Sequence, residues 1–227
     1  MKRFLLAVSA FALTNVAFGA ESGAADPARL AALMTPCAEC HGPEGASAQP
    51  GVPHLDRQDV AYLIESLALL AVGQRPTKVA GHVPADWTAN DRRAVAAFYN
   101  RIRPVRAPES FDNEKLATGR EVFLERCESC HENGGRDPDY RGSGSARLAG
   151  QRMDYLREQL RSYLGGKRKF LVGVKRESFL GMPIGVRGAQ VRERLNPIGE
   201  TEIEAIVHFL ASNPIDDPKP GKRRARP

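Results

Sequence analysis

The chain has 227 residues, 26% of them charged and 42% hydrophobic, which is the ordinary composition of a globular protein. Its 33 basic and 27 acidic residues give a formal charge of +6 at pH 7, and no nucleic-acid partner follows from so modest an excess. Beyond the first twenty residues no stretch is apolar enough to span a bilayer, so a multi-spanning membrane protein is excluded.

The first twenty residues have the pattern of a secretory signal peptide. Lys2 and Arg3 precede an apolar run over 4–18, and small residues then offer a cleavage site. The run is short for a membrane span, although an uncleaved anchor is the open alternative. We expect residues 1–20 to be removed, which leaves 31 basic against 27 acidic residues and a charge of +4.

Nearly all of the remaining pattern is helical, so the predicted fold class is all-α. Asp26 and Pro27 form an N-cap and first-turn pair, and the segment from Thr88 to Asp91 resembles a capping box. Helices are predicted from about residue 28 into the first cysteine pair, and over 58–72, 89–102, 111–126, 151–164 and 199–212.

The second half of the chain repeats the first. At an offset of 93, the residues Leu55, Gln58, Tyr62, Leu63, Leu67, Gly73 and Arg75 fall on Leu148, Gln151, Tyr155, Leu156, Leu160, Gly166 and Arg168. Seven identities in one register indicate a duplicated unit. Two prolines within 103–110 mark the linker. We therefore predict domains over 26–102 and 111–213, followed by a basic tail over 214–227.

Each half carries one C-x-x-C-H motif. The residues are Cys37, Cys40 and His41 in the first half and Cys127, Cys130 and His131 in the second. In c-type haem attachment, two thiols add across the vinyl groups of the porphyrin and the adjacent imidazole ligates the iron. The two copies account for all four cysteines. They predict two covalently bound c-type haems.

Two other functions are known for paired cysteines, zinc binding and dithiol redox chemistry. A zinc site would bring cysteines and histidines together on one ion, whereas here each cysteine pair has its own histidine. A thioredoxin-like dithiol would need a βαβ context that this sequence lacks. Attachment of c-type haem takes place outside the cytoplasm, which agrees with export and makes a bacterial periplasm the expected location.

The residues after the second motif carry a family resemblance. The segment Arg147–Gln151, with Tyr155, Gln159 and Gly166–Arg168 downstream, resembles the cytochrome c4 type of diheme class I cytochrome c. The resemblance covers about 26–212. It implies two tandem class I cytochrome c domains, each wrapped around one haem with a proximal His and a distal Met, and haems close enough for electron exchange.

The first half departs from this implied pattern. It has Asp56 and Arg57 where the family tends to have Ala-Gly, and it has Arg29 where the second repeat has Gly119. These differences make the first half the looser match.

The distal ligand of the first haem is another departure. The sequence has no methionine between Met34 and Met153, and His82 stands where one is expected. We predict that His41 and His82 ligate the first iron, and that Met34 packs within the first helix. The alternatives are a surface-loop His82 with an open or water-filled sixth position, and ligation by His54, against which the register argues.

For the second haem, Met182 is the predicted distal ligand, because Met153 belongs to a helix. The intervening segment 169–180 is expected to cover the haem edge. His208 is the alternative ligand, but on its helix it points about 160° away from the apolar face. A solvent-side role is therefore expected for His208.

These ligands predict a function. Methionine raises the potential of a haem relative to a second imidazole, so the N-terminal haem should be the low-potential site and the C-terminal haem the higher one. We expect a periplasmic carrier of single electrons between redox proteins such as a dehydrogenase, an oxidase or a reductase. No catalytic residue is predicted.

The alternative function is a diheme enzyme, or the electron-transfer subunit of a dehydrogenase, in which one haem opens a coordination position. Diheme peroxidases are considerably longer than this chain, and haem attachment uses every cysteine, so a cysteine-ligated catalytic haem is excluded.

Basic residues gather in two places, Lys167–Lys169 with Lys175 and Arg176, and Lys222–Arg226 at the end of the chain. They are either ordinary solvated surface or a means of steering the protein towards an acidic partner or a membrane surface.

Overall fold

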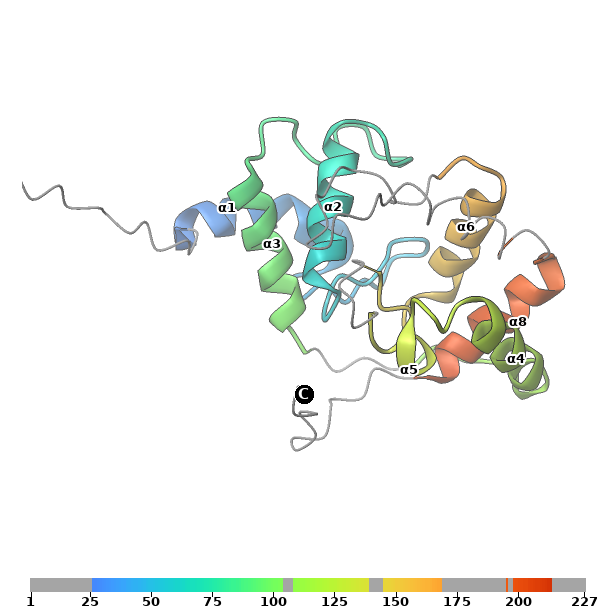
Figure 1. Cartoon of the computed structure of the whole chain (residues 1–227). Helices are drawn as coiled ribbons and strands as arrows, with labels where there is room; N and C mark the ends of the chain where they lie inside the picture. The colour runs from blue at the N-terminus through green and yellow to red at the C-terminus, as the bar shows by residue number, and fades with distance from the viewer. Residues whose placement is uncertain (1–25, 104–107, 139–144, 169–194, 196–197, 214–227) are drawn as a thin grey trace, which may run out of the picture.

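The computed structural model describes residues 26–103, 108–138, 145–168, 195 and 198–213. These residues form helices and turns and contain no strand, which confirms the all-α prediction (Figure 1). Within the same ranges, no helix combines the length and the apolar character needed to cross a membrane. The predicted signal peptide, Met182, the segment 169–180 and the tail over 214–227 lie outside the described residues.

The first half contains α1 (Pro27–His41), α2 (Val60–Ala71) and α3 (Ala89–Arg101). Each begins at a side-chain cap that satisfies a free backbone N–H of the first turn. Asp26 accepts a hydrogen bond from Ala28 N–H at 3.2 Å, and Asp59 accepts one from Tyr62 N–H at 2.8 Å. The capping box predicted before α3 is present, because Asp91 N–H donates to Thr88 Oγ1 and Thr88 N–H donates to an Asp91 carboxylate oxygen.

The second half contains the 3₁₀ turn η1 (Asn113–Lys115), α4 (Leu116–Arg126), the short α5 (Glu132–Gly135), α6 (Met153–Leu164) and α8 (Glu200–Ser212). The helix predicted from 111 therefore starts later, at Leu116. The sequence did not predict α5. There Asn133 and Gly134 have φ of 56° and 66°, and the Glu128 carboxylate accepts hydrogen bonds from both of their N–H groups, at 2.9 and 3.1 Å.

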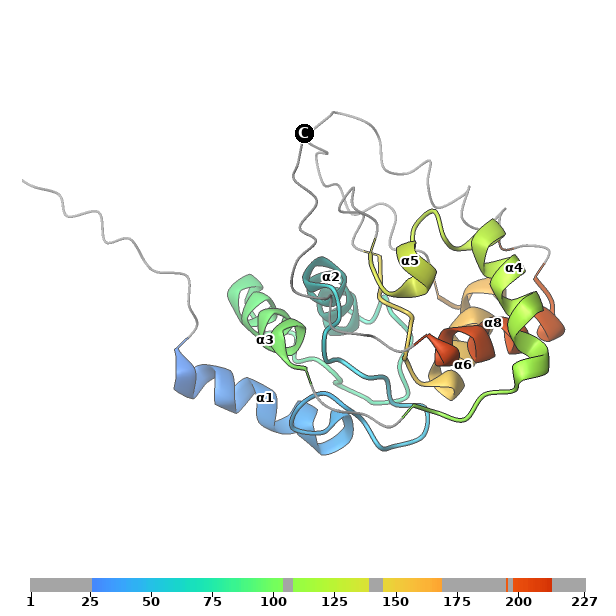
Figure 2. The same ribbon diagram turned by 90° about the horizontal axis from the view of Figure 1, so that it is seen from below.

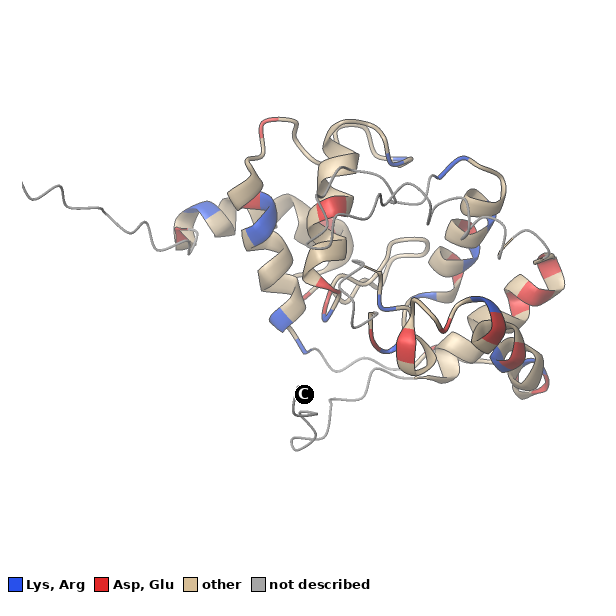
Figure 3. Ribbon diagram, in the orientation of Figure 1, with Lys and Arg blue, Asp and Glu red and all other residues tan. Residues whose placement is uncertain are grey.

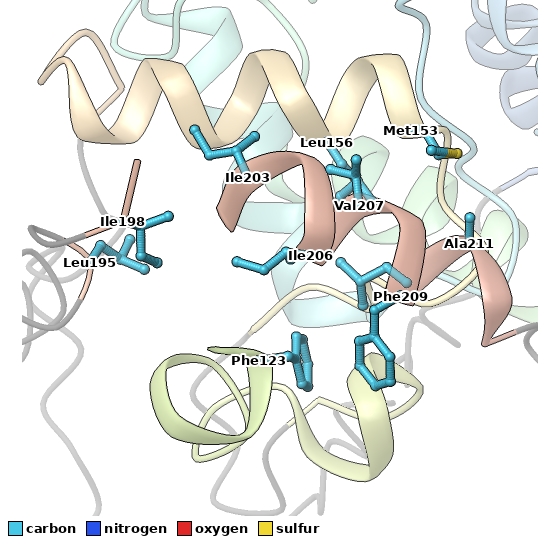
Figure 4. Packing of buried hydrophobic residues seen from close by; sticks show 11 residues of the cluster. Phe123, Met153, Leu156, Leu195, Ile198, Ile203, Ile206, Val207, Phe209 and Ala211 are labelled. Atoms are coloured by element: carbon cyan, nitrogen blue, oxygen red, sulfur yellow. The ribbon is translucent and has the colours of Figure 1, made fainter. Parts of the chain in front are cut away.

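Each half has its own hydrophobic core. The N-terminal core consists of Leu33, Met34, Leu63, Val83, Trp87, Val95, Ala96 and Tyr99. The C-terminal core, shown in Figure 4, consists of Phe123, Met153, Leu156, Leu195, Ile198, Ile203, Ile206, Val207, Phe209, Leu210 and Ala211. Neither core draws a residue from the other half, and α1–α3 lie apart from α4, α6 and α8 in Figures 1 and 2. Met34 packs in the first helix as predicted.

The repeat keeps its backbone at the point where the sequence departs from the family pattern. Arg57 and Gly150 are 93 residues apart and both are left-handed, with φ of 57° and 63°. Their N–H groups donate to equivalent places, Arg57 to Tyr99 O at 2.8 Å and Gly150 to Leu210 O at 3.1 Å. A left-handed non-glycine residue costs about 1–2 kcal/mol, so the fold holds Arg57 there at a cost that Gly150 avoids.

The two halves differ in how their first and last helices cross. A Cβ on Gly119 of α4 would lie 2.1 Å from Ala205 O of α8, so only glycine permits this approach. In the first half, Arg29 occupies the corresponding position and joins α1 to α3 through a bidentate ion pair with Asp91, at 3.0 and 3.1 Å. This pair also lowers the pKa of Asp91, because the guanidinium donates to its carboxylate.

The close crossing predicts a stability effect. Gly119→Ala should destabilise the protein by about 1–3 kcal/mol, because the new methyl group forces α4 and α8 apart. Denaturant unfolding followed by helical circular dichroism measures this change. The exposed neighbour Thr118 is the control, and Thr118→Ala should stay within about 0.5 kcal/mol of the wild type. Equal stability of the two variants would contradict the predicted crossing.

His208 anchors the entry into the second half. It is half-buried on α8, and its Nδ1 accepts a hydrogen bond from Asp112 N–H at 3.0 Å. Burial lowers the pKa of the imidazole, and nearby Lys115 lowers it further. The neutral ring is thus the form that holds η1 against α8.

This contact predicts a pH dependence of the free energy of unfolding. Because the folded pKa lies below the unfolded value of about 6.5, the unfolded chain takes up the proton first as the pH falls. The contribution of His208 is complete above that pH and is lost as the pH falls through the folded pKa. In His208→Asn the amide oxygen can accept the same bond without titrating, so the free energy of unfolding should depend less steeply on pH as the pH falls below about 6.5. Parallel pH profiles for the two proteins would refute this role.

Candidate haem sites

The histidines of the two motifs have matching hydrogen bonds. His41 is buried at the end of α1, and its Nδ1 lies 2.9 Å from Pro53 O. His131 follows α4, and its Nδ1 lies 2.7 Å from Ala146 O. A backbone carbonyl at Nδ1 places the proton there and leaves Nε2 free to ligate a metal. Both imidazoles are therefore oriented as haem ligands require.

The four cysteines lie in the last turn of α1 and in the turn after α4, and none of them forms a disulfide. Among the described residues, no three His, Cys, Asp or Glu side chains converge as a metal site would need.

The fold brings His82 opposite His41. Their ring centroids are 6.1 Å apart and their planes differ by 18°. With metal–nitrogen bonds of about 2 Å, and each ring centroid about 1 Å beyond its nitrogen, two imidazoles on one metal would have centroids about 6 Å apart. The Nδ1 of His82 lies 2.9 Å from Thr77 Oγ1, which leaves Nε2 as the nitrogen able to coordinate.

The other candidates fall elsewhere. His54 lies at the boundary between the halves, where Gln151 binds both of its backbone polar groups. His208 contacts Asp112, as described above. Arg168 does not belong to the surface cluster expected from the sequence, because it is buried and donates to Tyr62 and Gln159. Figure 3 shows both acidic and basic residues on α4 and α6, whereas the charged residues of α8 are all acidic.

A symmetric hydrogen-bond exchange joins the two halves. Gln58 accepts a bond from Arg147 N–H at 2.7 Å and donates to Arg147 O at 3.0 Å. Gln151 accepts one from His54 N–H at 2.7 Å and donates to His54 O at 2.9 Å. Each member of one exchange lies 93 residues from its counterpart in the other. The halves therefore meet through the same contact twice, as across a two-fold axis.

A second exchange of the same symmetry involves arginine and tyrosine. Arg75 donates to Tyr155 Oη at 2.7 Å, and Arg168 donates to Tyr62 Oη at 3.0 Å. We call these four residues, with the nearby Tyr163, the Arg–Tyr cluster. Six of the interface residues are among the repeat identities, but identities at a fixed offset indicate only a duplication and not a contact.

The Arg–Tyr cluster fits a negatively charged group. Among the described residues, the groups that act most strongly on Arg75 and Arg168 are the tyrosines and each other, with no carboxylate. Arg168 Nε is buried without a hydrogen-bond partner in the described part of the chain. Burial would raise the pKa of Tyr62, yet the two guanidiniums lower it. Buried cations need a counter-charge.

Haem supplies such a charge through its two propionates, and its iron stores one electron by cycling between the ferric and ferrous states. Arg75 lies close enough to lower the pKa of both His41 and His82. Arg75 and Arg168 are therefore the residues of this chain that would hold the propionates at the boundary.

Comparison with known proteins agrees with this geometry. No family model matches the chain. Cytochrome c4 of Azotobacter vinelandii is 28% identical over 178 residues, which cover 69% of this chain and 79% of that protein. The thiosulfate dehydrogenase electron acceptor of Thiomonas intermedia is 25% identical over 193 residues, 81% of each chain. The crystal structure of reduced cytochrome c4 from Pseudomonas stutzeri matches with a TM-score of 0.62 at 22% identity, covering 82% of this chain and 97% of that one.

The repeated helical fold is therefore that of the class I c-type cytochromes, two domains in tandem. Within that class, the similarity to these proteins supports a diheme electron-transfer cytochrome of the cytochrome c4 type, with two covalently bound haems. The resemblance stated from the sequence is confirmed.

The symmetric hydrogen-bond exchange predicts that losing the bonds of one glutamine lowers the stability of the protein. Gln151→Leu removes both hydrogen bonds that Gln151 makes to the backbone of His54 at the boundary, which should lower the free energy of unfolding by about 1–3 kcal/mol. Denaturant unfolding of the full chain tests this. Gln49→Leu is the matched control, because it removes only an exposed bond to Glu39 O within one half. If both substitutions cost the same, the exchange does not hold the halves together.

Proposed function

We propose that this cytochrome is a periplasmic carrier that accepts single electrons at a low-potential N-terminal haem and passes them to a higher-potential C-terminal haem. The residues assigned to attachment and ligation are Cys37, Cys40, His41 and His82 for the first haem and Cys127, Cys130, His131 and Met182 for the second. The domains are assigned to 26–102 and 111–213, joined by 103–110.

The observation that carries the proposal is the pairing of His41 with His82. The centroid separation of 6.1 Å is close to the separation of about 6 Å expected for two imidazoles on one iron. An iron held on both faces has no position left for a substrate, which favours a carrier over an enzyme. The side chain of His82 is held by Thr77 at Nδ1, and the next residue, Val83, is buried in the core. These two contacts fix the position of His82 in the loop.

The order of the potentials follows from the ligands. Arg75 and Arg168 are symmetric about the boundary, and positive charge near a haem favours its reduced state. Because both haems receive this contribution, it raises both potentials and leaves their difference to the axial ligands. Imidazole at His82 lowers the first potential relative to the thioether of Met182 at the second.

The location and partners are proposed on separate grounds. The signal-like segment 1–20 and the extracytoplasmic chemistry of c-type attachment support the periplasm. The similarity to a protein named as a thiosulfate dehydrogenase electron acceptor supports a periplasmic dehydrogenase as the electron donor. The tail over 214–227 is proposed to steer the protein towards an acidic partner or a membrane surface.

The ligands can be tested by visible and far-red spectroscopy. The ferric protein should show one sulfur-to-iron charge-transfer band, not two. His82→Met should add a second band and raise the lower potential, and Met182→His should remove the original band and bring the potentials together. The reduced wild-type protein should bind carbon monoxide poorly. If His82→Ala changes neither the spectrum nor the lower potential, His82 is only a loop residue and the carrier proposal loses its main support.

A further inference from the structure

The loop that carries His82 is tied to the fold on both sides. Before it, the N–H groups of Gln74 and Arg75 donate to Leu69 O at the end of α2, at 2.9 and 3.2 Å. After it, Val83 and Trp87 are buried in the N-terminal core, at 4% and 7% exposure. The backbone near His82 is therefore fixed, while the direction of its ring depends on what the side chain contacts.

That contact is Thr77. Its Oγ1 lies 2.9 Å from His82 Nδ1 and also accepts a hydrogen bond from Val79 N–H at 3.1 Å. A hydroxyl oxygen has two acceptor positions. When Nε2 of His82 ligates iron, Nδ1 carries the proton and donates to Oγ1, so that both acceptor positions of Thr77 are used.

We propose that Thr77 is the positioning residue for the distal ligand of the first haem: its hydroxyl orients the His82 ring, selects the Nδ1–H tautomer and sets how strongly Nε2 donates to the iron. This rests on the proposed ligation by His41 and His82. A hydrogen-bond acceptor at the outer nitrogen raises the basicity of a metal-bound imidazole. Greater basicity stabilises the ferric state, so Thr77 lowers the potential of the first haem.

The two imidazoles of this haem are thus oriented by different means. His41 donates to a backbone carbonyl, that of Pro53, which no substitution can remove. His82 donates to a side chain. The hydrogen-bond acceptor on the distal side can therefore be removed by one substitution. Thr77→Val removes the hydroxyl with almost no change of size, and Thr77→Ser keeps it.

The test compares Thr77→Val and Thr77→Ser in the full diheme chain. Thr77→Val should raise the lower of the two potentials, leave the higher one unchanged, and let added imidazole displace His82 at an about tenfold lower concentration. Thr77→Ser should restore wild-type behaviour in all three measurements. Thr118→Val, an exposed threonine of α4, is the matched control and should change none of them.

Paramagnetic resonance of the ferric protein separates the possible failures. If the wild type lacks a low-spin bis-imidazole signal, the ligation by His82 is wrong, and the role of Thr77 falls with it. If that signal is present and Thr77→Val has an unchanged potential and unchanged imidazole displacement, only the role of Thr77 is wrong. Equal shifts in the Val and Ser variants would also overturn it, because they would show that Thr77 matters only for the shape of the loop.

Discussion

Two guanidiniums at the boundary between the halves, those of Arg75 and Arg168, are the constraint on which the arrangement of this cytochrome depends. Each reaches across to a tyrosine of the other half, and neither is matched by a carboxylate among the described residues. Such charges are costly unless a counter-charge is present. The haem propionates would supply this counter-charge, and cofactor binding and the joining of the domains would then depend on the same two arginines.

Local chemistry made much of the fold predictable, and long-range contacts explain what was missed. The helix caps at Asp26 and at Thr88 to Asp91 can be predicted from the sequence, because each cap accepts a hydrogen bond from a backbone N–H within three residues. The late start of α4 could not be predicted from the sequence, because the segment before it is held by a hydrogen bond from Asp112 N–H to His208, 96 residues away along the chain. The left-handed turn at Asn133 likewise depends on Glu128, which no periodicity reveals.

The sites divide in the same way. The missing methionine and the repeat register led to His82, and the structure brings its ring opposite that of His41. Nothing in the sequence indicated Thr77, because a threonine five residues before a histidine is unremarkable until the loop closes. The glutamine, tyrosine and arginine identities were visible, but a repeat at fixed spacing does not say which identical side chains face the other half. Only the contacts in the structure show which of the identical residues lie at the interface between the halves.

Contacts that are the same in both halves cannot by themselves make the potentials of the two haems differ, and so cannot give electron transfer a direction. The exchanges through Gln58 and Gln151, and through the two arginines, act on both halves alike. Asymmetry therefore has to enter through positions where the repeats have diverged. Arg29 stands where the second repeat has Gly119, and it changes the packing of the first helix. Arg57 stands where the second repeat has Gly150, and it adds the cost of a left-handed backbone but keeps the equivalent hydrogen bond. In the proposed assignment, the distal ligand is His82 in the first half and Met182 in the second, and this difference would change the ligand field of the iron itself. It is the divergence that would act directly on the potential, so that a duplicated and nearly symmetric protein would acquire a preferred direction from one ligand and the hydroxyl beside it.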